Sequence, residues 1–416
     1  MVSAMQLSNR VQQLAPSATL AVTARVKELK DQGVDVIGFG VGEPDFQTPD
    51  HIKNAAIEAL QGGATHYMPV PGEPSARQAI ADKLRAENSI TVGPDDVIIT
   101  VGAKHAVYLA LQCLIDPPTG SAAAQEVLLP TPAWVSYRPM IELAGGRAVD
   151  LPTTIDTDFK VTAEQLAAAV NDRTAAILLN SPSNPCGTMY SPDELRALAT
   201  VLAEHPQVVV IADEIYEKLI YGDAEHLSIG SLDELAERTV TINGLSKAYA
   251  MTGWRVGYAA APKPSSGNSI IAAMSKLQGQ MTSNITSFCY AAINEALAKG
   301  GPEVERMRQV FAERAKRMKS HLDAMPGVRC PDLTGAFYAF PDISTYMNRT
   351  SPGGAAISDS VSFAQAMLDE AHVAVVPGEA FGEAGQGHIR LSFACSNEQI
   401  DAGCQRIADW LGRFGS

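Results

Sequence analysis

The sequence predicts an α/β protein built on a parallel sheet that helices cover on both faces. The first sign is a pair of strand-like runs, residues 175–180 and 207–213, which are apolar along almost their whole length. Such strands are buried on both faces, as in a parallel sheet. The second sign is that helical stretches separate the runs. The third is size, because 416 residues with 46% hydrophobic content suffice for two domains.

The order of the elements follows from the apolar runs and the breaks between them. Strand-like segments are expected, in chain order, at residues 96–100, 126–130, 175–180, 207–213, 238–242 and 255–262. The first leads into Gly102-Ala-Lys104 and an apolar helical run. The third leads into Ser181-Pro-Ser-Asn-Pro-Cys-Gly187, a turn built from Pro, Asn and Gly. After a break at Ala298-Lys-Gly-Gly-Pro302, residues 303–321 are expected to form a helix with a charged, solvated face.

Polar side chains follow the ends of three predicted strands. They are Asn184, Asp213, Tyr216 and Lys247. Ligands of parallel sheets bind in the crevice at the carboxyl ends of the strands, so one crevice can hold all four side chains. Lys247 and Arg255 are the charged residues of an otherwise uncharged loop segment, and a lysine on such a loop can carry an electrophile. The alternative is an ordinary solvated lysine.

Read in chain order, the motifs resemble those of the class I aminotransferases, which are pyridoxal phosphate enzymes of the aspartate aminotransferase fold. The resemblance covers nearly the whole chain and is to the bacterial-type aspartate aminotransferases, a branch that includes aspartate/prephenate aminotransferases. The motifs that carry it are Pro16-Ser-Ala-Thr19, Gly42-Glu-Pro-Asp-Phe46, Tyr67, Thr100-Val-Gly-Ala-Lys104, Pro132-Ala-Trp-Val-Ser-Tyr137, Asn184, Asp213, Lys247, Gly335-Ala-Phe337 and His388-Ile-Arg-Leu-Ser392.

This resemblance implies the type I fold of pyridoxal phosphate-dependent transferases. That fold has a large domain with a mainly parallel seven-stranded sheet covered by helices, and a smaller α/β domain. The large, cofactor-binding domain is expected at residues 48–300. The small domain is expected to be discontinuous, with residues 1–47 and 301–416. A homodimer with active sites shared across the interface is also implied.

The resemblance assigns the residues around the ring of the cofactor, pyridoxal 5′-phosphate. Lys247 is the catalytic residue and forms the Schiff base with the cofactor. Asp213 keeps the ring nitrogen protonated, as an electron sink requires; its alternative role is a helix N-cap. Tyr216 and Asn184 hydrogen-bond the phenolic oxygen. Trp134 stacks on the ring, unless it is an ordinary core tryptophan.

The phosphate group needs a helix N-terminus and positive charge, which favour an anion. Gly102, Ala103 and Lys104 open the predicted helix after the first strand, and Arg255 adds a bidentate partner. By the resemblance, Tyr67 reaches the phosphate of the neighbouring subunit. Many relatives carry a hydroxyl three residues before the lysine, where this chain has Gly244, and Ser246 is expected to replace part of that contact.

Substrate binding is expected to use local charge, because the formal net charge of the chain is −14. The resemblance implies that Arg390 binds the substrate α-carboxylate, aided by the backbone of Gly42 and by Trp134 and Asn184. Arg390 could instead pair with a nearby acid in its strand. The distal carboxylate is assigned to Lys104, Ser17 and Thr19, because residues 278–284 contain no arginine of the kind the animal-type branch uses. Lys104 could instead be a solvated helix residue.

The function implied is ping-pong transamination from L-aspartate, or a related dicarboxylic amino acid, to 2-oxoglutarate. A prephenate aminotransferase, possibly a bifunctional enzyme, and a pyridoxal phosphate-dependent carbon-sulfur β-lyase remain alternatives. A nicotinamide dehydrogenase is excluded because Gly38, Gly40 and Gly42 lack the spacing of the dinucleotide fingerprint.

Composition limits the partners and the location. The six cysteines show no CxxC or Cys/His clustering, so no metal site is expected and reduced thiols in a cytoplasmic protein are the default. No signal peptide or membrane-spanning run is apparent. Without a basic patch, no nucleic acid partner is expected. The expected partners are small molecules, the amino acid and keto acid substrates.

Overall fold

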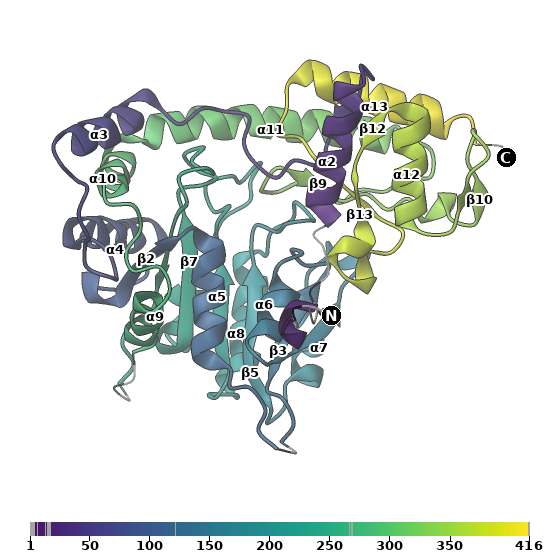
Figure 1. Ribbon diagram of the computed structural model, residues 1–416. Coiled ribbons are helices and arrows are strands. Elements are labelled where there is room, and N and C mark those ends of the chain that lie inside the picture. The colour runs from purple at the N-terminus through teal and green to yellow at the C-terminus, as the bar shows by residue number, and fades with distance from the viewer. Residues whose placement is uncertain are drawn as a thin grey trace.

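A computed structural model describes residues 5, 7–12, 14, 18–120, 122–265, 267 and 269–414, without the side chains of 18–21 and 23. Its centre is a seven-stranded sheet with helices packed on both sides, and a second group of smaller sheets and helices lies beside it (Figure 1). The predicted α/β class is therefore confirmed.

The main sheet is parallel except for one strand. Its strands, in spatial order, are β2 (Val97–Val101), β8 (Val256–Ala260), β7 (Thr239–Gly244), β6 (Val209–Asp213), β5 (Thr174–Asn180), β3 (Glu126–Thr131) and β4 (Arg147–Pro152). β8 runs antiparallel to both β2 and β7. All six predicted strands are present. β4 was not predicted, because three of its six side chains are only half-buried and its apolar signal is weak.

Alternation along the strands divides the apolar core between the two faces of the sheet, because successive side chains point to opposite sides. Ile98 packs with Val107 on the face covered by α5, α6 and α9. Val97 and Ile99 belong to a second cluster, which packs against α3, α4 and α10. At the other end of the sheet, Ile177 packs against α7 and α8. Both faces are thus buried, as the apolar runs indicated.

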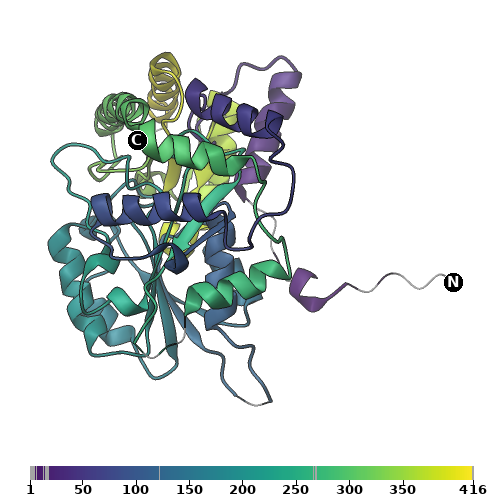
Figure 2. The ribbon, with the colours of Figure 1, turned by 90° about the vertical axis from the view of Figure 1, so that its left-hand side faces the viewer.

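The helices vary from one turn to six turns in length. They are α1 (Asn9–Gln12), α2 (Ala18–Asp31), α3 (Asp50–Gln61), α4 (Pro74–Asn88), α5 (Ala103–Leu114), α6 (Tyr137–Leu143), α7 (Ala163–Ala169), α8 (Pro192–Ala203), α9 (Ile270–Gly279), α10 (Cys289–Lys299), α11 (Gly301–Asp323), α12 (Ser360–Ala371) and α13 (Asn397–Leu411). Figure 2 shows α1 standing away from the rest of the molecule. The predicted helix at 303–321 is confirmed as part of α11.

Short sheets link the N-terminal segment to the C-terminal third. β1 (Ile37–Gly38) pairs with β12 (Val373–Ala374), and β14 (Ile389–Ser392) lies between β13 (Val376–Pro377) and β9 (Tyr338–Ala339). A hairpin of β10 (Arg349–Thr350) and β11 (Ala356–Ile357) completes this part. Ile37 and Phe39 share one apolar cluster with the residues of α11, α12 and α13. This packing agrees with a small domain at 1–47 and 301–416, which stays a prediction.

All six cysteines are free. Among the helices of the described residues, none is both long and apolar enough to cross a lipid bilayer.

Candidate active site

Lys247 lies where the carboxyl ends of the parallel strands meet. β5 and β6 are paired so that Asn180 lies opposite Asp213, and β6 is followed by β7, after which Lys247 comes in the next loop. Its Nζ donates a hydrogen bond to the backbone oxygen of Gly42, 2.5 Å away. The lysine therefore ties the N-terminal segment to the edge of the main sheet.

The pKa of Lys247 is lowered to about 8 by burial of its ammonium group, with further lowering by the cations Arg390 and Arg255. Glu43 and Asp213 act in the opposite direction. About a tenth of the amine is therefore neutral at pH 7, far more than for an ordinary lysine, which suits a nucleophile or a general base.

Chemical modification can measure this shift. In cofactor-free protein, an amine-reactive reagent is expected to label Lys247 with a midpoint near pH 8, because the amine is protonated and unreactive below its pKa. The same peptide in denatured protein should have a midpoint near the ordinary lysine value of about 10.4. Peptide mass mapping over a pH series gives both midpoints, and equal midpoints would contradict the lowered pKa.

Asp213 is the last residue of β6 and is 4% exposed. Its Oδ2 accepts a hydrogen bond from the Tyr137 hydroxyl at 2.7 Å, and its Oδ1 accepts one from the backbone N–H of Ile215 at 3.2 Å. Burial raises the pKa of Asp213 to about 6, against the lowering effect of Tyr137. No ion pair within the described residues involves Asp213, so its carboxylate is available to a cationic group of a ligand.

Arg390 lies on β14 and is 2% exposed. Its Nη1 donates to Asn184 Oδ1 at 3.0 Å and its Nη2 donates to the Gly40 backbone oxygen at 2.8 Å. The guanidinium also lies over the Tyr338 ring, 4.6 Å from its centroid. Its Nε is buried without a hydrogen-bond partner. The sequence left open a pairing of Arg390 with a nearby acid. Within the described residues, its hydrogen-bond partners are instead the amide oxygen of Asn184 and the backbone oxygen of Gly40.

Tyr216 and Trp134 lie around the same crevice. The Tyr216 hydroxyl is 3.0 Å from the Tyr338 hydroxyl, and Lys247 Nζ lies 5.9 Å from the Tyr216 ring centroid. Trp134 packs edge-on against Tyr137, with 5.1 Å between the ring centroids. Lys104 Nζ lies 4.8 Å from the Trp134 ring centroid. Trp134 is only half-buried, so one side of its ring can contact a ligand.

The N-terminus of α5 forms the positively charged side of the crevice. Gly102 precedes α5 with φ +78°, a conformation that glycine adopts without strain, and a Cβ at this position would lie 2.5 Å from Arg255 Nη2. The guanidinium therefore lies directly against the helix start. The pKa of Lys104 is lowered by burial and by the charge of Arg255. Two cations and the unpaired N–H groups of a helix terminus form a suitable site for an anion such as phosphate.

Several predicted site residues have a less defined place. Ser246 is buried one position before Lys247, and Gly244 has no room for a side chain, since a Cβ would lie 2.8 Å from the Val256 backbone oxygen. Tyr67 is 90% exposed and does not reach the crevice of its own chain. Ser17 lies outside the described residues. Thr19 is in α2, but its side chain is not among those described.

Two residues of the site were missed. Tyr137 donates to Asp213, and Tyr338 contacts both Tyr216 and Arg390. Tyr137 ends a motif that was recognised and Tyr338 directly follows another, but neither was given a role, because no local pattern shows that a tyrosine hydroxyl reaches a buried aspartate 76 residues away. A buried tyrosine needs a hydrogen-bond partner, and that requirement is the signal that could have suggested them.

Known proteins that this chain resembles are aminotransferases. Residues 34–407 match the family model described as aminotransferase class I and II. An aspartate aminotransferase of Bacillus sp. (strain YM-2) is 44% identical over 96% of this chain and 98% of its own. An aspartate/prephenate aminotransferase of Cereibacter sphaeroides is 43% identical over 96% and 97%. The crystal structure of the aspartate aminotransferase from Rhizobium meliloti superposes with a TM-score of 0.93 at 36% identity, covering 99% of this chain and 100% of that one.

Proposed function

The chain belongs to the class I and II aminotransferases, and from this membership we propose that it transfers the amino group of L-aspartate, or of a related dicarboxylic amino acid, to 2-oxoglutarate. The observation that carries the proposal is the grouping of charges around Lys247. Asp213 and Arg390, from distant parts of the chain, and Arg255, from the same loop segment, all act on its amine. Relatives named aspartate aminotransferase support the choice of substrate.

The proposed cofactor is pyridoxal 5′-phosphate, and the donor set of the crevice fits it. Asp213 is a buried carboxylate without an ion-pair partner among the described residues, which suits a protonated ring nitrogen. The start of α5, with Lys104 and Arg255, suits the phosphate. Lys247 would hold the aldehyde and Trp134 would contact the ring. When bound, the cofactor supplies an electron sink for the bond that breaks at the substrate α-carbon.

Each protein group then has a task in a ping-pong reaction of two half-reactions. Arg390 binds the substrate α-carboxylate in a fork, which orients the Cα–H bond. Lys247 Nζ accepts the α-proton and later returns it, and its lowered pKa keeps enough neutral amine for this transfer. Tyr216 and Asn184 would donate hydrogen bonds to the phenolic oxygen of the cofactor. These roles stay predictions.

Lys104 is proposed to bind the distal carboxylate of the substrate. Its ammonium group lies beside the half-buried ring of Trp134 and senses the charge of Arg255, so it faces the crevice and not only the solvent. The predicted contributions of Ser17 and Thr19 to the same carboxylate remain untested.

Lys104→Ala is expected to lower the ratio of aspartate to alanine turnover by about 10- to 100-fold, the effect of one lost hydrogen bond to a charged group. Initial rates with each donor and 2-oxoglutarate measure the ratio. Lys276→Ala, which removes an exposed lysine of α9, is the matched control. An unchanged ratio in Lys104→Ala would show that this lysine does not select dicarboxylates.

A homodimer with shared active sites is also proposed. Tyr67 is 90% exposed, and exposed apolar side chains, Ile57 and Leu60 on α3 and Met281 after α9, accompany it. A subunit interface over these elements would remove such apolar side chains from water. Within a dimer, Tyr67 would complete the phosphate site of the neighbouring subunit.

Tyr67→Phe is expected to weaken cofactor binding by about 3- to 10-fold, because one hydrogen bond is lost. Mixed dimers of Tyr67→Phe and Lys247→Ala chains test whether the tyrosine acts across the interface. Each mixed dimer should contain one intact site, which combines Lys247 of one chain with Tyr67 of the other, and should retain the cofactor with wild-type affinity. If the mixture shows the weakened affinity instead, Tyr67 does not act between subunits.

The proposed function is tested by mixing cofactor-loaded protein with L-aspartate alone. The absorbance of the bound cofactor should change and oxaloacetate should appear in stoichiometric amount, since one half-reaction is complete without an acceptor. An unchanged spectrum and no oxaloacetate would exclude aspartate as the donor.

Prephenate is a second candidate acceptor, because relatives of similar identity are named aspartate/prephenate aminotransferase. Once aspartate has converted the enzyme, adding either 2-oxoglutarate or prephenate should restore the first spectrum if that compound is an acceptor. The rates of the two recoveries rank the acceptors.

A further inference from the structure

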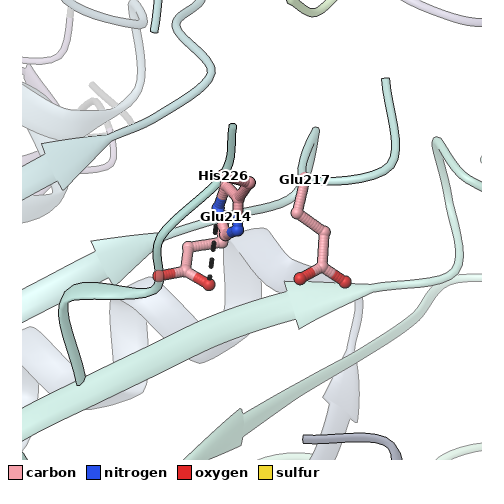
Figure 3. Close-up of side chains that lie close together, drawn as sticks. All are labelled: Glu214, Glu217 and His226. Atoms are coloured by element: carbon pink, nitrogen blue, oxygen red, sulfur yellow. Dashed lines mark ion pairs between the residues drawn. The ribbon is translucent and has the colours of Figure 1, made fainter. Parts of the chain in front are cut away.

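A network of buried polar and charged side chains lies directly behind the Asp213 segment. Figure 3 shows three of its members, Glu214, Glu217 and His226, with their side chains close together. Glu214 is 3% exposed and Glu217 is 8% exposed. None of these residues has a place in the proposed reaction, although Glu214 follows Asp213 directly in the chain.

The first half of the network is an ion pair that is neutral as a unit. Lys83 of α4 is buried against Glu217, and its Nζ also donates to Asn88 Oδ1 at 2.7 Å. Asn88 Nδ2 donates to Glu217 Oε2 at 2.5 Å. Despite burial, chiefly the charge of Lys83 holds the pKa of Glu217 at about 2. The ammonium of Lys83 therefore already neutralises the carboxylate that would be needed for a metal ion at Glu214, Glu217 and His226.

The second half contains a carboxyl group and an imidazole, neither of which has an ion partner of its own. The Ser228 hydroxyl donates to Glu214 Oε2 at 2.6 Å. His226 Nε2 lies 3.8 Å from the same oxygen and is buried without a hydrogen-bond partner. The ring of His226 also hydrogen-bonds the backbone of Ser181, which favours its protonated form. At 3.8 Å the two groups are neighbours but are not hydrogen-bonded to each other.

The charges of the surroundings disfavour ionisation of either group alone. Burial, followed by the negative charge of Glu217, raises the pKa of Glu214 to about 8. Burial lowers the pKa of His226, against the effect of Glu217. At neutral pH a carboxylic acid therefore faces a neutral imidazole, and the two together carry no net charge.

We infer that Glu214 and His226 form a neutral pair, a carboxylic acid beside a neutral imidazole, and that this pair lets Asp213 carry the negative charge that faces the cofactor. The inference rests on the proposed function, since it concerns the role of Asp213 toward the ring nitrogen. Glu214 and His226 are positioning residues, because they act through Asp213 and not on the substrate.

The physical reason is the repulsion between neighbouring anions. Burial already raises the pKa of Asp213 to about 6. A second negative charge at Glu214 would raise it further and would favour a protonated Asp213, which could not pair with a cationic ring nitrogen. The neutral pair removes this repulsion and keeps the hydrogen bonds that join α4 to the segment after β6.

The titratable groups around the pair come from every element packed against it. They are Lys83 and Glu87 on α4, Asp213, Glu217 and Lys218 on β6 and the following segment, Tyr249 after Lys247, and Tyr258 on β8. The ammonium of Lys83 neutralises the carboxylate of Glu217, and burial raises the pKa of both tyrosines. Glu214 is therefore the acid expected to ionise first as the pH rises above neutrality.

The test is a pH titration of the absorbance of the bound cofactor, from about pH 6 to about pH 10. The wild-type holoenzyme should show a transition near pH 8 as the pair loses its proton. Glu214→Gln, which is uncharged and nearly isosteric, should lack that transition and should match the wild type below it. Glu87→Gln, at the exposed end of the same network, is the control and should retain the transition.

The neutrality of His226 is tested by His226→Leu, which removes the imidazole. The transition should persist with little change in its midpoint, because a neutral ring that makes no hydrogen bond to Glu214 exerts no net charge on it. This variant also decides the matter if Glu214→Gln does not fold. A midpoint raised by about one pH unit or more would show that His226 is cationic in the native protein, and would overturn the neutral pair.

Other outcomes overturn the inference separately from the proposed function. If Glu214→Gln shifts the titration by about one unit near pH 7, a negative charge has been removed and Glu214 is ionised in the native protein. If Glu214→Gln keeps the transition, another group is responsible. Asp213→Asn should alter the spectrum over the whole range, and a spectrum like that of the wild type would contradict the role of Asp213 and not the neutral pair.

Discussion

Replacing Lys247 with alanine is expected to reduce transamination by about 10⁴-fold or more, the combined loss of a covalent anchor and a general base. Asp213 and Arg390, the groups assigned to the ring nitrogen and the substrate carboxylate, both act on Lys247 Nζ. The variant should still fold, since within the described residues the side chain makes one hydrogen bond, to the Gly42 backbone oxygen. Turnover of aspartate with 2-oxoglutarate measures the loss, and circular dichroism checks the fold.

The matched control is Lys263→Ala, which removes an exposed lysine after β8. It should retain wild-type activity and cofactor content. Cofactor bound by Lys247→Ala should be released on gel filtration, because only the phosphate and ring contacts would hold it. Substantial turnover by Lys247→Ala would disprove the assignment of the catalytic lysine.

Arg390→Ala is expected to lower kcat/KM by about 10²- to 10³-fold for aspartate and for alanine alike. Both donors carry an α-carboxylate, so the effect should not depend on the side chain. The magnitude follows from losing a buried, charged, forked contact, which costs about 2–5 kcal/mol. The substitution also leaves Asn184 Oδ1 and the Gly40 backbone oxygen without the donors that they have at 3.0 and 2.8 Å.

Steady-state kinetics with both donors measure the effect, and Arg390→Lys distinguishes charge from geometry. A lysine keeps the charge but has no planar fork, so its kcat/KM should lie between those of the wild type and Arg390→Ala. Arg329→Ala, which removes a side chain that is 61% exposed, is the control. A loss confined to aspartate would assign Arg390 to the distal carboxylate instead, and would exchange its role with that of Lys104.

Much of the fold and of the candidate site could be predicted because the signals are local. The apolar runs that became β5 and β6 identify themselves by composition, and Asp213 ends such a run. Gly102 before α5 and the loop that carries Lys247 follow strands in the same way. Motif order along the chain then identified the family, which the comparisons confirm.

The contacts of these residues could not be predicted, because their partners are distant in sequence. Arg390 meets Asn184 and Gly40 across 206 and 350 residues of chain. The antiparallel direction of β8 depends on the packing of its neighbours, since the apolar pattern of a buried strand is the same in both directions. Tyr67 is 90% exposed, and the partner proposed for it lies in a second subunit, which no pattern within one chain reveals.

The buried network at Glu214 separates what the sequence determined from what the tertiary structure decided. By itself the sequence determined the class of fold, the family and the chemical identity of the groups at the strand ends, since periodicity, turn residues and motif order are local properties. Only the tertiary structure decided which of these groups carries charge. Lys83 neutralises Glu217, whereas Glu214 meets a neutral imidazole. Protonation depends on burial and on charges a few ångströms away, and those distances exist only once α4 has packed against the segment that follows β6.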